Sequence, residues 1–151
     1  MSIQNKTDND DRTKVYSIFG GTPRIVVNGN VVPSGTSYSA ASVLSPYVGL
    51  MSPVSIRIEQ TNFGKDSIKA KVIIKKHVTT PANAILFLGL VEDTVFVDGG
   101  NGETKHFNVL RKSLSGSVPQ ALSLGFPVGD SVSIEMTGVA AAFWDMNRMF
   151  A

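Results

Sequence analysis

Cysteine is absent from this chain of 151 residues, and neither sign of charge predominates. Without cysteine the sequence can form no disulfide bond, no thiolate metal site and no thiol nucleophile. The 14 basic and 12 acidic residues leave a formal net charge of +2. Such a balance gives no strong electrostatic field to attract nucleic acid or an anionic membrane. We therefore predict no binding to nucleic acid.

Long apolar runs are also missing. No segment approaches the roughly 18 consecutive apolar residues that span a bilayer, and the polar N-terminus has no apolar region typical of a signal peptide. We expect no membrane insertion, and we expect that any export signal was removed or never present. Apolar residues still make up 42% of the chain and charged residues only 17%, which favours a folded, β-rich protein with an uncharged polar surface.

Patterns that carry catalysis or bind metals are scarce as well. The sequence contains no Gly-x-Ser-x-Gly elbow, and a serine without an adjacent base is a poor nucleophile. His77 and His106 are the only histidines, and their spacing fits no ligand motif. The glycine-rich segment 98–103 precedes a strand pattern, so we interpret it as a hairpin tip rather than a calcium or phosphate loop. We predict a protein that is not an enzyme and uses no metal or cofactor.

The first third of the chain predicts a tail, a hairpin and a helix. Residues 1–13 are polar without periodicity, which indicates a flexible tail. Two short apolar runs then flank Asn28-Gly29, a strong signal for a two-residue hairpin turn. Apolar residues at mixed spacings of three and four over 38–50 predict a short helix, which Pro46 disturbs. We assign residues 14–52 to this β-hairpin and helix.

From Val54 onward the apolar pattern has a period of two, which is typical of strands with one dry face and one wet face. We interpret the lysines at 69, 71, 75 and 76 as a solvated basic face on one such strand. Residues 84–91 are apolar at both parities and predict a strand that is covered on both sides. About seven strands, separated by turns every ten to fifteen residues, predict an immunoglobulin-like antiparallel β-sandwich over 53–151. The fold class is therefore mainly β.

Two passages resemble a known family. Residues 15–29, with Thr22-Pro23 before an apolar run, look like the late part of a thioredoxin-like domain. Residues 90–93, 101–104 and 106–112 are similar to the C-terminal β-sandwich of the Omp28-related proteins, a bacterial outer-membrane or secreted family with a thioredoxin-like N-terminal half. The resemblance implies a cell-envelope or extracellular location and a thioredoxin-like β-β-α fragment over 14–52. The sequence also departs from thioredoxin-like enzymes, because it lacks the Cys-x-x-Cys that carries their redox chemistry.

Several residues in these passages are candidates for structural or interaction roles. Pro23 occupies the position of the family's cis-proline, although the sequence leaves the isomer of the Thr22-Pro23 bond open. Arg111 lies at the end of a predicted strand, where its guanidinium could pair with Glu92 or Asp93 on the preceding strand. The full set of candidates is Pro23, Glu92, Asn101, Glu103, His106, Asn108 and Arg111.

These observations favour a non-catalytic structural or protein-interaction module of an exported or cell-envelope bacterial protein. An apolar helix face and an open sheet edge over 14–52 also predict a homodimer through that segment. One alternative is a fragment of a thioredoxin-like oxidoreductase whose cysteines lie upstream. Another is a carbohydrate-binding sandwich, which would need exposed aromatic residues on one face; the sequence offers few beyond Tyr16, Tyr38, Tyr47 and Trp144.

Overall fold

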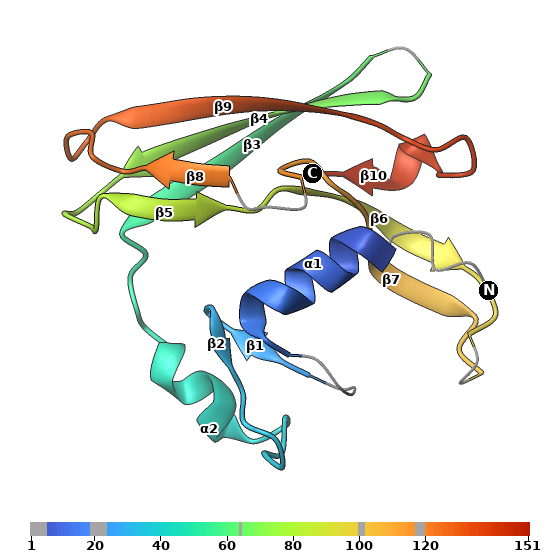
Figure 1. Cartoon of the computed structure of the whole chain (residues 1–151), viewed down its shortest axis with the longest axis horizontal. Helices are drawn as coiled ribbons and strands as arrows, with labels where there is room; N and C mark the ends of the chain where they lie inside the picture. The colour runs from blue at the N-terminus through green and yellow to red at the C-terminus, as the bar shows by residue number, and fades with distance from the viewer. Residues whose placement is uncertain (1–5, 19–23, 64, 100–101, 117–119) are drawn as a thin grey trace. The chain divides into compact units, whose positions relative to one another are not determined.

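The computed structural model describes residues 6–18, 24–63, 65–99, 102–116 and 120–151. The chain divides into two compact units, of which the smaller comprises Lys6–Ser52 and the larger contains Pro53–Ala151. Strands predominate, and every strand pairing among these residues is antiparallel (Figure 1). The protein is therefore mainly β, as the period-two pattern predicts.

The smaller unit begins with helix α1 (Lys6–Tyr16), so the prediction of an unstructured tail is wrong for residues 6–13. Ion pairs one turn apart support this helix, Lys6 with Asp10 and Lys14 with Asp11. The Thr13 hydroxyl donates to the Asp10 carbonyl at 2.8 Å. None of its residues is buried. A helix without an apolar stripe leaves no hydrophobic periodicity by which the sequence would reveal it.

The predicted hairpin is present as β1 (Val26–Val27) and β2 (Asn30–Val31). Asn28 and Gly29 form its turn with φ angles of 48° and 80°, the left-handed values that a type I′ turn requires. The helix predicted over 38–50 is much shorter. One α-helical turn, α2 (Ala41–Leu44), passes directly into the 3₁₀ turn η1 (Ser45–Tyr47), whose first turn contains proline.

The larger unit contains a three-stranded sheet in the order β3-β4-β9. Its strands are β3 (Val54–Phe63), β4 (Ser67–Lys76) and β9 (Ser131–Val139). The period-two prediction is confirmed on β4, because alternate residues from Ile68 to Ile74 are buried. Lys76 shares their face and is only 6% exposed, so its assignment to the basic outer face is wrong.

The remaining strands of the larger unit form one two-stranded and one three-stranded sheet. In one, β5 (Asn83–Leu86) pairs with β8 (Gln120–Ser123). In the other, β6 (Gly89–Phe96) lies between β7 (Lys105–Ser113) and β10 (Met149–Phe150), which follows the 3₁₀ turn η2 (Met146–Arg148). The single strand predicted over 84–91 is thus two strands, and it is not covered on both sides because Ile85 is 58% exposed.

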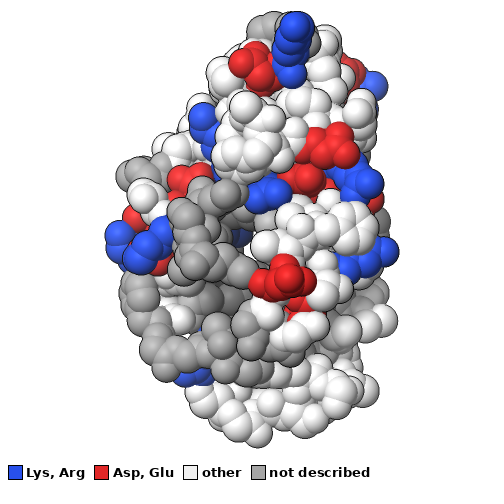
Figure 2. All heavy atoms as spheres, turned by 90° about the vertical axis from the view of Figure 1, so that its right-hand side faces the viewer, with Lys and Arg blue, Asp and Glu red and all other residues white. Residues whose placement is uncertain are grey.

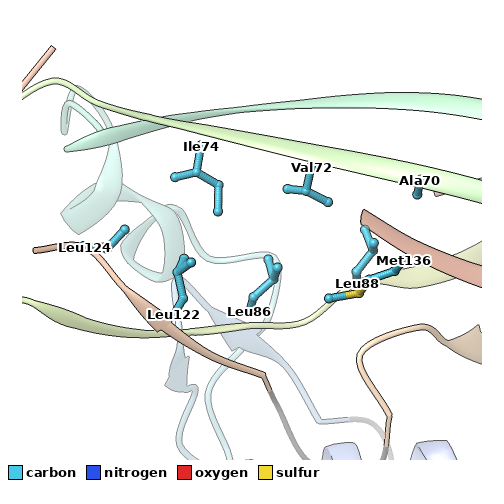
Figure 3. Packing of buried hydrophobic residues seen from close by; sticks show 8 residues of the cluster. All are labelled: Ala70, Val72, Ile74, Leu86, Leu88, Leu122, Leu124 and Met136. Atoms are coloured by element: carbon cyan, nitrogen blue, oxygen red, sulfur yellow. The ribbon is translucent and has the colours of Figure 1, made fainter. Parts of the chain in front are cut away.

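Two apolar clusters form the core of the larger unit. Figure 3 shows Ala70, Val72 and Ile74 of β4 facing leucines of β5, β8 and the segments next to them. A second cluster joins Ile68 to Leu90 of β6 and Met149 of β10, with Trp144 packed against it. The β3-β4-β9 sheet therefore contributes to both clusters through β4, its central strand.

Candidate functional site

A buried carboxylate lies in the centre of the β10-β6-β7 sheet. Glu92 on β6 pairs with Met149 on β10 and with Val109 on β7. Its side chain lies on the same buried face as Leu90 and Thr94, and the residue is only 5% exposed. A carboxylate in such surroundings must have hydrogen-bonding or charged partners, because its desolvation is costly.

Arg111 supplies that partner, as the strand parity predicts. Its Nε donates to Glu92 Oε2 at 2.7 Å, and the two side chains are 13% and 6% exposed. The register shifts at this point, since Val91 pairs with Leu110 but Leu90 pairs with Lys112. Arg111 is therefore the extra residue of a β-bulge. The guanidinium that bonds the buried carboxylate therefore comes from the bulge itself.

The same carboxylate anchors the segment before β10. The backbone N–H of Asp145 donates to Glu92 Oε1 at 3.4 Å, and the Arg111 guanidinium lies 5.9 Å from the centre of the Trp144 ring. Asp145 in turn caps η2 by accepting from the Asn147 N–H at 3.0 Å. One ion pair thus connects β6, β7 and the C-terminal segment.

Cations and aromatic rings gather beyond this pair, at the outer end of β6 and β7. Lys105 Nζ lies 4.7 Å from the ring centre of Phe107 and 5.9 Å from that of Phe96. Arg148 lies 5.5 Å from Phe96 and donates to the Thr94 carbonyl at 3.3 Å. Both phenylalanines are more than half exposed. Figure 2 shows basic and acidic side chains intermingled on the side of the molecule that it presents. No large patch of one sign is visible there among the described residues.

The other sequence candidates do not join this cluster. His106 pairs with Val95, on the strand face opposite to Thr94. The Nε2 of His106 contacts the Val97 carbonyl at 3.0 Å, and its Nδ1 lies 3.9 Å from the Glu103 carboxylate. Asn108 is exposed and has a φ of 52°. Pro23 and Asn101 lie outside the described residues.

The structure brings together one pair of chemical interest that the sequence did not reveal. His77, the residue after β4, has its Nε2 2.9 Å from Ser55 Oγ of β3, and both residues are exposed. Their separation of 22 residues carries no motif, and only the register that places Pro53 beside His77 brings them together. A serine nucleophile also needs a group that orients the histidine and an oxyanion site. No described carboxylate forms an ion pair with His77.

Neither metal ligands nor membrane spans emerge within the described part of the chain. No group of three or more His, Asp or Glu side chains there could hold a metal ion. No described helix is both long and apolar enough to cross a membrane.

A second candidate site is the outer edge of β3, by which we mean the backbone groups of Ile56, Ile58 and Gln60. The Pro53 carbonyl accepts from the His77 N–H at 2.9 Å, so odd-numbered residues of β3 point their backbone groups toward β4. Even-numbered residues must then point away from β4, because N–H and C=O of one residue face the same neighbour. No strand of the described residues pairs with that edge.

The side chains along this edge are unusually exposed for a strand that adjoins the core. Ile56 pairs with the buried Ile74, so both lie on the inner face of the sheet, yet Ile56 is 58% exposed and Ile58 is 41% exposed. Two residues further on, Gln60 on the same face bonds the C-terminal segment through the Met149 carbonyl and the Ala151 N–H. The two isoleucines therefore lie beside an open edge and remain uncovered.

No protein-family model, curated protein or solved structure matches this chain. The resemblance to the Omp28-related proteins therefore depends on the sequence passages alone and stays a prediction.

Proposed function

We propose that this chain is a non-catalytic protein-interaction module, and that it contacts its partner through the outer edge of β3. The observation that carries the proposal is a ten-residue strand with exposed Ile56 and Ile58 beside backbone groups that no described strand satisfies. Such an edge is a template for an added strand, because main-chain hydrogen bonds supply affinity and flanking side chains supply specificity.

The buried charges support a structural role rather than catalysis. Glu92 and Arg111 neutralise each other, and the second oxygen of Glu92 holds the backbone of Asp145. A catalytic acid or base must instead reach a substrate. At the outer end of β6 and β7, Lys105 lies over two phenylalanine rings, which favours protein contacts over sugar stacking there.

We also propose that residues 53–151 form an immunoglobulin-like sandwich and that 14–52 is the thioredoxin-like fragment of an Omp28-related protein. The apolar cluster between β4 and the β5-β8 pair supports the first assignment. The Asn28-Gly29 hairpin followed by a helical turn supports the second. The family resemblance would place the protein in the bacterial cell envelope or outside the cell.

Site-specific photocrosslinking tests the proposed contact surface. A photoreactive phenylalanine analogue at position 56, in the full chain inside the cells that make it, should yield covalent adducts with protein. Val128 is a matched control position, because it is also apolar and 52% exposed but lies in a loop. We expect several times more adduct from position 56 than from position 128. Equal yields at the two positions would rule out β3 as the contact surface.

A further inference from the structure

We propose that the partner at the outer edge of β3 is β3 of a second copy of this chain, paired antiparallel about Ile58. The inference rests on the proposed function, since it names the occupant of the same edge. It follows from the self-complementarity of the strand, which the next steps derive from backbone direction, charge and apolar exposure.

The backbone permits this pairing. Ile56, Ile58 and Gln60 point their N–H and C=O groups outward, as the hydrogen bond between His77 and Pro53 establishes. A two-fold axis at Ile58 makes Ile58 exchange two hydrogen bonds with its own copy and makes Ile56 do the same with Gln60. β3 and β4 keep one register over their whole length, so no bulge twists this edge away from a partner.

The charges on the outer face select the register. Arg57 and Glu59 are the charged residues of β3, and within one chain their side chains meet at 2.8 Å while 71% and 45% exposed. An axis at Ile58 places Arg57 directly opposite Glu59 of the other copy, twice by symmetry. Opposite charges in such positions stabilise an antiparallel pair, and like charges destabilise it.

Neighbouring registers lack this complementarity. An axis at Arg57 would set the two Arg57 side chains against each other, and an axis at Glu59 would do the same with the two glutamates. An axis at Ile56 would place Arg57 across from Ser55. Neither Arg57 nor Glu59 would then face an oppositely charged residue of the other copy. The axis at Ile58 alone among these four combines two ion pairs with contact between the two Ile58 side chains, which removes exposed apolar surface from water.

Disulfide trapping tests the register directly, because the chain has no other cysteine. In the proposed dimer, residue 58 faces its own copy as a hydrogen-bonded pair with Cα atoms about 5.5 Å apart, within the range that a disulfide spans. The variant Ile58→Cys should therefore oxidise to a species of twice the 16.1 kDa chain mass. Ile56→Cys is the matched control, since its two copies would lie four residues out of register, about 13 Å apart.

A charge exchange provides a second test by sedimentation equilibrium at high protein concentration. Arg57→Glu would place glutamate opposite Glu59 of the other copy and should weaken dimerisation roughly five-fold. The double variant Arg57→Glu/Glu59→Arg restores both opposite-charge pairs and should regain the original affinity. Both residues are exposed, so neither variant should prevent folding.

The outcomes separate this inference from the proposed function. Preferential oxidation of Ile58→Cys together with rescue by the double exchange supports the dimer. Preferential oxidation of Ile56→Cys, or a dimer through residues 14–52 without trapping at position 58, overturns it. Photocrosslinks from position 56 to a different protein, with no crosslink between copies, overturn the dimer and leave the proposed function intact. No adduct from position 56 removes both.

Discussion

Lys76 is a charged residue that the larger unit uses inside its core. Its Nζ donates to the carbonyls of Leu124 at 2.8 Å and Phe126 at 3.1 Å, and it lies 5.9 Å from the Phe126 ring centre. Strand parity alone places Lys76 on the inner face with Ile74, whereas lysine identity favours the outer face. The sequence cannot decide between them, because the two carbonyl acceptors come from a segment about 50 residues away.

Replacing Lys76 should therefore destabilise the fold more than replacing its neighbour. Lys76→Met keeps most of the aliphatic stem but leaves two carbonyls without their charged donor, which should lower the free energy of unfolding by about 2 kcal/mol. Lys75→Met is the matched control on the exposed face and should change it by less than about 0.5 kcal/mol. Urea unfolding followed by the fluorescence of Trp144, the single tryptophan, measures both. Equal effects would contradict the buried role of Lys76.

The ion pair between Glu92 and Arg111 should also be important for stability. Arg111→Met leaves the Glu92 carboxylate buried without its cation and should cost about 3 kcal/mol of unfolding free energy. The double variant Glu92→Gln/Arg111→Met removes the uncompensated charge and should recover much of that loss.

Urea unfolding monitored by far-UV circular dichroism measures this pair without depending on Trp144, which lies near Arg111. Lys112→Met, at the exposed adjacent position, is the control. If Arg111→Met proved no less stable than Lys112→Met, the pair would have no structural role. The contact was predictable from strand order and parity, but the bulge that contains Arg111 was not, because register depends on the partner strand.

Among the elements, β4 and β9 are joined by a cross-strand ion pair that makes a pH-dependent prediction. Lys69 Nζ lies 2.7 Å from Glu135 Oε2. The hydrogen bond from Lys69 is the main cause that lowers the pKa of the Glu135 carboxyl below its ordinary value of 4.5, and the charges of Lys69 and Lys71 lower it further by smaller amounts. Because the folded-state pKa is lowered, the stabilisation is complete above 4.5 and is lost as the pH falls through the folded-state pKa.

A carboxyl titration by NMR checks this assignment. The pKa of Glu135 should lie below 4.5 in the native protein and should rise toward 4.5 in Lys69→Met. Lys71→Met should raise it less, since Lys71 acts only through its charge. A larger rise in Lys71→Met than in Lys69→Met would show that the hydrogen bond is not the main cause.

Elements with a clear burial pattern were predictable, and elements defined by their partners were not. The alternation over β4 indicates a strand because one face must leave water. The pattern over 84–91 reads as one strand, yet the chain changes partner there. Leu88 donates to the Ser115 hydroxyl and accepts from the Leu114 N–H, so pairing with β8 ends and pairing with β7 begins. The helix α1 was missed because nothing in it is buried.

At the scale of the whole molecule, the larger unit combines two buried apolar clusters with a strand, β3, whose described side chains are mostly exposed. β4 is buried between neighbours on both sides, whereas the described side chains of β3 beyond Val54 are all exposed. A sequence shows the same alternation for a covered and an uncovered strand, so it could not reveal this edge. Strand order leaves one edge of β3 open, because β3 pairs with β4 alone among the described strands.

Amide hydrogen exchange along β3 in dilute protein tests the open edge most directly. The amides of Arg57 and Glu59 point toward β4 and should exchange slowly, whereas those of Ile56, Ile58 and Gln60 should exchange quickly in the isolated chain. Slow exchange at all five positions would mean that another segment of the same chain covers this edge, and the proposed contact surface would not exist.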